Sequence, residues 1–214
     1  KEIELFAKLI EKMHFSFQGL LFNKQKKQDK FLKKLKKREE ITDTIELEVA
    51  EYLTKISSFN ITEEATRRIR GMHSMINDLE RVGDIYYQMS KTFERMQSEG
   101  TELQEPVMVR LREMLDLIHE NIRLVRSNLE KDPGSIDLEK AMELEHAINS
   151  YRDELLEFHY HQLETNAYNN KVGFIFLDYL NRLEKIGDHL FNVNEALAGV
   201  KVKAAYERVV EERG

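Results

Sequence analysis

A nine-residue segment occurs twice in this chain of 214 residues, about half a chain length apart. Residues 76–84 read INDLERVGD and residues 180–188 read LNRLEKIGD, so five of nine positions are identical at a spacing of 104 residues. An internal repeat of this kind indicates two copies of one structural unit. The sequence therefore predicts two related halves that meet near Gly100.

Apolar residues recur at intervals of three and four along nearly the whole sequence, which is the period of an amphipathic helix. Leu5, Leu9, Met13 and Phe17 form one such stripe, and strict alternation never persists over the length of a strand. Turn-forming residues interrupt the pattern, and Thr62 has the position of a helix N-cap. The predicted helices cover residues 2–22, 27–57, 62–97, 103–130, 136–165 and 170–198.

Long helices joined by short connections form antiparallel bundles. We therefore expect an all-α fold of two antiparallel three-helix bundles, related by a pseudo-twofold repeat. The repeat boundary divides the chain into a first repeat at residues 1–100, a second repeat at residues 101–199 and a charged tail at residues 200–214.

Composition excludes several classes of site. The chain has no cysteine, which excludes disulfides, thiol nucleophiles, Fe–S clusters and thiolate zinc sites. Its apolar runs are far shorter than the ~20 residues that span a bilayer. The net charge of −6 argues against nucleic acid as a partner.

The repeated segment carries two carboxylates one helical turn apart, and a glycine lies between them. The two copies are Glu80, Gly83 and Asp84, and Glu184, Gly187 and Asp188. Like charges at this spacing repel by a few tenths of a kcal/mol, and a glycine inside a helix costs about 1 kcal/mol relative to alanine. Because both penalties are repeated, we expect them to serve a function, with the missing side chain allowing a neighbouring helix or an ion to approach.

The preceding helix of each half has oxygen-bearing side chains at the same spacing. Glu39 and Asp43 lie in the first half, and Glu145 and Asn149 lie 106 residues later, with Glu48 and Glu154 expected in the same register. Oxygen ligands without thiolate suit hard or borderline cations. The predicted metal ligands are Glu80, Asp84, Glu184, Asp188, Glu39, Asp43, Glu145 and Asn149, for Fe, Mn, Zn, Mg or Ca. Asn149 removes one charge, so we expect the two sites to differ in affinity.

One segment is strongly basic, although the chain as a whole carries a net negative charge. Residues 24–38 contain nine cations in fifteen positions. Such a run is typical of a solvated helix face or of a surface for an anionic partner or membrane. The residues assigned to this partner or membrane surface are Lys26, Lys27, Lys30, Lys33, Lys34, Lys36 and Lys37.

Residues 79–84 (LERVGD) and 183–188 (LEKIGD) resemble the doubled E-x-x-x-D motifs of PhoU-type phosphate-uptake regulators. This resemblance implies a six-helix fold with one such motif in the third helix of each bundle, and some members hold iron or other metal clusters on these motifs. Residues 63–72 (EEATRRIRGM) are more similar to the PhoU domain appended to bacterial sodium/phosphate symporters than to free-standing PhoU. Asn149 departs from the acidic pattern of the family.

The resemblance also implies partners and a location. We expect a non-enzymatic regulator of phosphate transport or phosphate signalling, whose partner is a membrane transporter domain or a phosphate-signalling protein. The sequence begins at Lys1 rather than Met, which favours a cytoplasmic domain excised from a transporter, at the inner face of the cell membrane. Apolar faces on the first and fourth helices favour a homodimer.

Two other interpretations remain open. In the first, the same acids serve a ferritin-like di-iron oxidase or iron-storage bundle. Glu143 and His146, with Asp116 and His119 as a near match, also have the ligand spacing of such bundles. Alternatively, the chain is a helical scaffold without metal, in which Arg81 and Lys185 neutralise the acids.

Overall fold

The computed structural model describes residues 2–23, 27–57 and 61–199. Lys26 and the predicted charged tail at residues 200–214 lie outside the described residues.

Six long α-helices make up nearly all of the described chain. They are α1 (Glu2–Phe22), α2 (Gln28–Ser57), α3 (Glu63–Ser98), α4 (Glu105–Leu129), α5 (Leu138–Glu164) and α6 (Asn170–Ala198), with a short 3₁₀ helix, η2 (Pro133–Ser135), before α5. The described residues contain no strand, so the all-α prediction is confirmed. None of the described helices combines the length and apolarity needed to cross a bilayer.

The helix bounds lie within two residues of the predicted ones, and local capping explains where α3 begins and ends. The hydroxyl oxygen of Thr62 accepts a hydrogen bond from the backbone N–H of Ala65, which satisfies a free donor in the first turn of α3. Gly100 has a φ of +64° just after α3, and the N–H of Thr101 donates to the carbonyl of Met96. This left-handed glycine and the bond that spans it form a Schellman motif.

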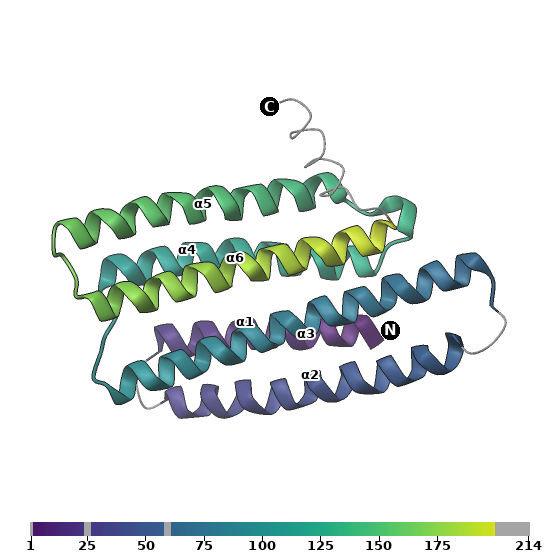
Figure 1. The fold of residues 1–214 in the computed structure, drawn as a ribbon, viewed down its shortest axis with the longest axis horizontal. Helices are drawn as coiled ribbons and strands as arrows, with labels where there is room; N and C mark the ends of the chain where they lie inside the picture. Colours follow the sequence, from purple (N-terminus) through teal and green to yellow (C-terminus); the bar gives the residue numbers. More distant parts are fainter. Residues whose placement is uncertain (1, 24–26, 58–60, 200–214) are drawn as a thin grey trace.

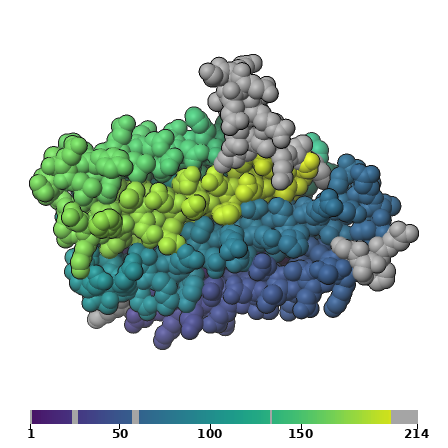
Figure 2. Space-filling model, viewed as in Figure 1, coloured from purple at the N-terminus to yellow at the C-terminus, as the bar shows by residue number. Residues whose placement is uncertain are grey.

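The two repeats stack side by side along their length (Figure 1). The central helices α3 and α6 pack against each other, α1 and α4 pack against each other behind them, and α2 and α5 lie at the outer edges. Figure 2 shows α3 and α6 running along the middle of the front face. Each repeat is a three-helix unit, as predicted, and the two units meet through four of the six helices.

One hydrophobic core crosses the boundary between the repeats. Phe6, Ile10 and Phe17 of α1 are fully buried, and so are Leu111 and Ile118 of α4, all in the same cluster. The apolar faces of α1 and α4, from which a homodimer was expected, therefore cover each other within one chain. These two faces therefore give no reason to expect a homodimer.

Glycines bring α2 close to α3, and α5 close to α6. A Cβ atom added to Gly83 would lie 3.2 Å from the Cγ2 atom of Thr42, and one added to Gly187 would lie 3.1 Å from side-chain atoms of Ile148. Thr42 and Ile148 are 106 residues apart, the spacing of the predicted ligands on the same helices. The expectation that these glycines permit close helix approach is thus confirmed in both repeats.

The close approach predicts a specific cost for a larger side chain. In Gly187→Leu, overpacking against Ile148 costs roughly 2–3 kcal/mol, of which helix propensity offsets about 1 kcal/mol. The melting temperature should therefore fall by about 2–8 °C, as measured by thermal denaturation. Gly134→Leu is the control, because no atom lies within 4 Å of a Cβ built at Gly134. An unchanged or higher melting temperature for Gly187→Leu would show that the approach is not tight.

Candidate metal centre

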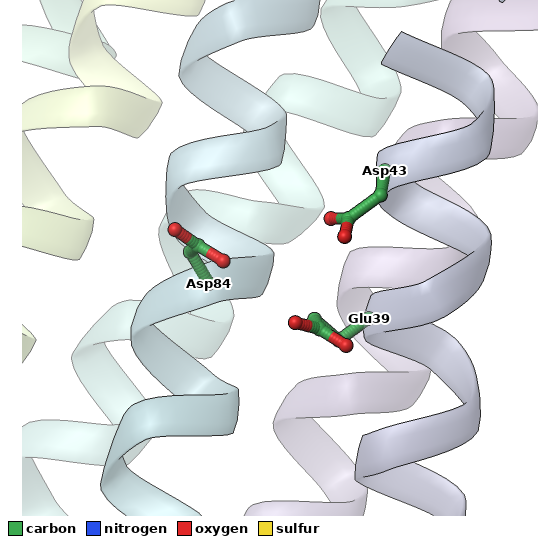
Figure 3. Close-up of side chains that lie close together, drawn as sticks. All are labelled: Glu39, Asp43 and Asp84. Atoms are coloured by element: carbon green, nitrogen blue, oxygen red, sulfur yellow. The ribbon is translucent and has the colours of Figure 1, made fainter. Parts of the chain in front are cut away.

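Three carboxylates converge between α2 and α3. Glu39 and Asp43 extend from α2 and Asp84 extends from α3, and one oxygen of each lies within 4.8 Å of the others. Figure 3 shows the three side chains directed into the same gap between the two helices. Among the described residues, they form the only such group of three or more possible ligands.

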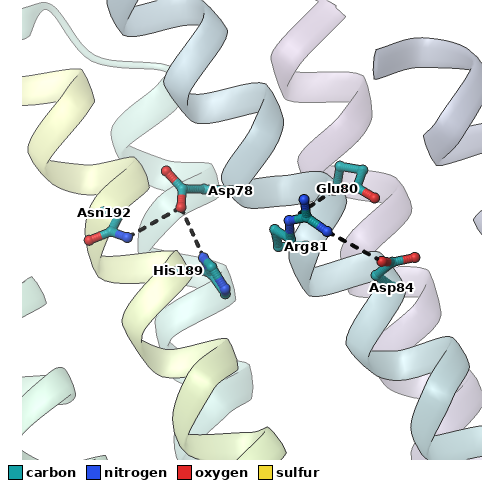
Figure 4. Close-up of polar contacts among 6 residues, drawn as sticks. All are labelled: Asp78, Glu80, Arg81, Asp84, His189 and Asn192. Atoms are coloured by element: carbon teal, nitrogen blue, oxygen red, sulfur yellow. Dashed lines mark hydrogen bonds and ion pairs between the residues drawn. The ribbon is translucent and has the colours of Figure 1, made fainter. Parts of the chain in front are cut away.

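A fourth carboxylate lies one turn from Asp84. Glu80 is only 8% exposed, and Arg81 lies between it and Asp84 (Figure 4). The guanidinium nitrogens of Arg81 are 3.7 Å from an oxygen of Glu80 and 3.7 Å from an oxygen of Asp84. The Arg81 side chain is 62% exposed, and ion pairs this long and this open to solvent contribute little. One such cation therefore compensates only part of the charge of four carboxylates.

The charge excess appears in the acid–base properties of the group. Burial, together with the negative charge of Asp84, raises the pKa of Glu80 to about 7, although Arg81 opposes the shift. Burial and Asp43 raise the pKa of Asp84, and burial, Asp43 and Asp84 raise that of Glu39. Each shift means that the ionised form is unfavourable without a positive charge in the gap. A cation bound there would relieve all three.

Glu46 was not among the predicted ligands. Its charge contributes to the raised pKa of Glu80, so it faces the same gap. Glu46 lies seven residues after Glu39, which is two helical turns and the same face. The predicted residue, Glu48, is exposed and lies five residues after Asp43, on a different side of α2. Glu48 and Glu154 keep the 106-residue spacing between the repeats, but a seven-residue spacing from Glu39 is what identifies Glu46.

The second repeat has a different arrangement. The amide nitrogen of Asn149 donates a hydrogen bond to Glu145, at 2.9 Å. Glu184 and Asp188 lie partly buried on α6, and these two acids with Glu145 do not form a group of three within 4.8 Å. The structure thus brings three of the eight predicted ligands together, places Glu80 beside them, and leaves the second set less convergent.

The ligand pairs of the di-iron interpretation do not converge. Glu143 pairs with Lys140 at 3.0 Å, and His146 is exposed. The ring of His119 stacks on that of His14, with 5.3 Å between the ring centroids. Within the described part of the chain, neither pair contributes to a group of three possible ligands.

The predicted basic residues lie just before α2 and along its first half. All those within the described chain are exposed, namely Lys27, Lys30, Lys33, Lys34, Lys36 and Lys37.

Comparisons with known proteins agree with this architecture. The family profile of the PhoU domain matches residues 3–93, which include the three converging carboxylates. No curated protein matches the sequence closely enough to count as a relative.

Solved structures share the fold over nearly the whole chain. PhoU from Pseudomonas aeruginosa is 16% identical, with a TM-score of 0.79 over 92% of this chain and 91% of that one. The phosphate transport system regulatory protein PhoU from Streptococcus pneumoniae is 18% identical, with a TM-score of 0.69 over 92% and 89%. A PhoU-like phosphate regulatory protein from Shewanella oneidensis is 11% identical, with a TM-score of 0.70 over 92% and 96%.

The matched domain bears on the di-iron oxidase interpretation, which called for an enzyme. Residues 3–93 match the PhoU domain, and the solved structures that share the fold include a phosphate transport system regulatory protein. The chain therefore contains a PhoU domain at residues 3–93 and has the fold of PhoU proteins over 92% of its length.

Proposed function

We propose that this chain is a regulatory domain for phosphate transport or phosphate signalling, in which a cation bound between α2 and α3 sets the packing of the first repeat. The single observation that carries the proposal is the convergence of Glu39, Asp43 and Asp84 within a PhoU domain. The matched solved structures include a phosphate transport system regulatory protein, which supports the phosphate-regulatory role.

The chemistry of the gap defines which ions fit. All donors are carboxylate oxygens, which suit Mg²⁺, Ca²⁺, Mn²⁺ and iron. Glu39 and Asp43 would hold the ion from α2, while Asp84 and the more deeply buried Glu80 would hold it from α3. Because the ligands come from two helices, the ion stabilises one packing of α2 on α3. Asp43 is exposed, so a phosphate oxygen has access to complete the coordination.

The partner in this proposal is a membrane transporter domain or a phosphate-signalling protein. The similarity of residues 63–72 to the PhoU domain of sodium/phosphate symporters supports a transporter, within the same full-length chain. The domain would then work in the cytoplasm at the inner face of the membrane. A change in helix packing at the metal centre would be the signal that it passes to this partner.

Neutral amides at the convergent ligands should abolish the response to metal. In Asp43→Asn/Asp84→Asn, Mn²⁺, Ca²⁺, Mg²⁺ or Fe²⁺ should no longer raise the melting temperature of metal-free protein. In the unmodified protein, an ion at a hundred times its dissociation constant stabilises the fold by about 2.7 kcal/mol, or roughly 5–11 °C. The measurement is a thermal-shift titration, supported by elemental analysis of purified protein.

The second repeat provides the matched control. Glu184→Gln/Asp188→Asn alters the equivalent motif on α6 and should leave most of the response intact, because those acids do not converge as a group of three. If no ion shifts the melting temperature of the unmodified protein, the metal proposal fails and the scaffold interpretation is favoured. Equal loss in both variants would place the site elsewhere.

In metal-free protein, the raised pKa of Glu80 predicts that this carboxylate destabilises the fold at neutral pH. Below about pH 4.5 this carboxyl is protonated in both the folded and unfolded states, so it does not affect stability. Between about pH 4.5 and pH 7 only the unfolded state ionises, and stability falls until the folded pKa of about 7 is passed. Glu80→Gln should therefore stabilise metal-free protein at pH 8 by about 1 kcal/mol, after allowance for solvent screening.

The same variant should respond less to metal, because it lacks a ligand. Chemical denaturation at pH 4 and pH 8, with and without the ion, measures both effects. A metal-free Glu80→Gln protein that is less stable than the unmodified chain at pH 8 would show that Arg81 already compensates the charge.

A further inference from the structure

Four exposed lysines, one just before α2 and three in its first half, lie on one side of the helix, and its converging carboxylates lie on another. Lys36 lies nearer the carboxylates and acts on Glu39. At 100° per residue, Lys27, Lys30, Lys34 and Lys37 fall within one sector that borders α1. Two contacts with α1 fix the orientation of this sector. The Phe31 ring packs on Gly19, and the guanidinium group of Arg38 donates a hydrogen bond to the carbonyl of Lys12. Glu39, Asp43 and Glu46 lie on the α3 side instead.

The neighbouring face of α1 is basic and apolar as well. Leu5, Lys8, Lys12, Phe15 and Phe22 share one stripe of this helix, with Glu4 at its edge. Leu5 is 51% exposed and Phe15 is 48% exposed, so two large apolar side chains project into solvent among cations. Together with Lys27, Lys30, Lys34 and Lys37, this stripe forms a surface that we call the basic–apolar face.

A shallow groove crosses the basic–apolar face between α1, α2 and α4. It is lined by the rings of Phe15, Phe22 and Phe31 and by Arg112 of α4. The guanidinium carbon of Arg112 lies 4.4 Å from the centroid of the Phe22 ring, and the ammonium nitrogen of Lys34 lies 5.8 Å from that of Phe31. Asp116, which accepts a hydrogen bond from Gln18, is the one acid in the groove lining.

From charge complementarity, we infer that the basic–apolar face binds the surface of an anionic bilayer. Lysines on an amphipathic helix are attracted to acidic headgroups, and exposed aromatic and aliphatic side chains insert at the headgroup boundary. At 1.5 Å per residue, the lysines extend along about 15 Å of α2 and the stripe along about 25 Å of α1. This breadth, and apolar side chains outside the groove, favour a lipid surface over a single acidic peptide.

This inference adds a membrane surface to the proposed function, and rests on it only in taking a membrane transporter as the partner. In Figure 1, α1 lies behind α3, so the basic–apolar face is turned away from the front face of α3 and α6. A bilayer behind α1 would leave α3 and α6 open to a protein partner. Because the net charge of the whole chain is −6, the attraction would come from this face and not from the chain as a whole.

The test is co-sedimentation of the protein with vesicles of phosphatidylcholine alone or mixed with phosphatidylglycerol. The unmodified chain should bind only the mixed vesicles, and binding should weaken with salt. The variant carries Lys27→Gln, Lys30→Gln, Lys34→Gln and Lys37→Gln. At about 1 kcal/mol for each lysine, its binding should fall by several hundredfold. Phe15→Ser, at an exposed position, should weaken binding by roughly tenfold.

A matched control removes the same number of charges from other faces. The control carries Lys91→Gln, Lys140→Gln, Lys171→Gln and Lys185→Gln, all exposed positions on α3, α5 and α6. It has the same net charge as the α2 variant and should bind nearly as well as the unmodified chain. Absence of binding to mixed vesicles, or equal loss in the two variants, overturns the inference. Tighter binding of a polyglutamate peptide than of vesicles would assign the face to an acidic protein segment and also overturn it.

The two proposals fail independently. The α2 variant retains Glu39, Asp43 and Asp84, so it should keep the metal-dependent rise in melting temperature. If the unmodified protein binds mixed vesicles without any response to metal, the metal centre is wrong and the membrane face stands. The reverse result leaves the metal centre and removes the membrane face.

Discussion

The close approach of α2 to α3 at Gly83 is the contact on which the candidate site depends. Thr42, which a Cβ at Gly83 would meet at 3.2 Å, is fully buried and lies next to Asp43, while Gly83 lies next to Asp84. The helices thus pack through one residue of each pair while the adjacent carboxylates meet at the edge of the contact. Burial of apolar neighbours such as Leu79 and Val82 stabilises this packing and offsets the repulsion between acids, which a cation would remove.

The two repeats share the same close helix approach at a glycine but differ in the polar residues beside it. Gly187 approaches Ile148 as Gly83 approaches Thr42, yet Asn149 stands where the first repeat has Asp43 and donates its own hydrogen bond to Glu145. An internal donor thus supplies part of what a cation would supply. The polar residues at equivalent positions also differ where α3 packs against α6. Asp78 binds His189 and Asn192 (Figure 4), whereas at the equivalent positions, 104 residues away, Arg182 binds Gln88.

Sequence periodicity sufficed for the features that depend on one helix. Helix boundaries followed from caps and turns such as Thr62 and Gly100, and the role of Gly83 followed from its cost inside a helix. Features that depend on how one helix is rotated against another could not be derived in this way. Glu46 faces Glu80 and Glu48 does not, because the contact with α3 selects one sector of α2. The convergence of the acids in the first repeat but not in the second likewise depends on tertiary packing.

Helix α2 joins the two surfaces proposed for this chain. Burial and the neighbouring acids raise the pKa of Glu39, and Lys36 lowers it, so the basic half of the helix acts on the candidate metal centre through the field of its charges. A cation between α2 and α3 would hold the acidic half of α2 against α3, and the lysines on the same rigid helix would keep a fixed position relative to α1. Without the ion, Glu39 and Asp43 would repel Asp84, and this repulsion would push α2 away from α3. Because Phe31 is seated on Gly19 near the start of α2, the response would be largest toward its far end, next to the start of α3.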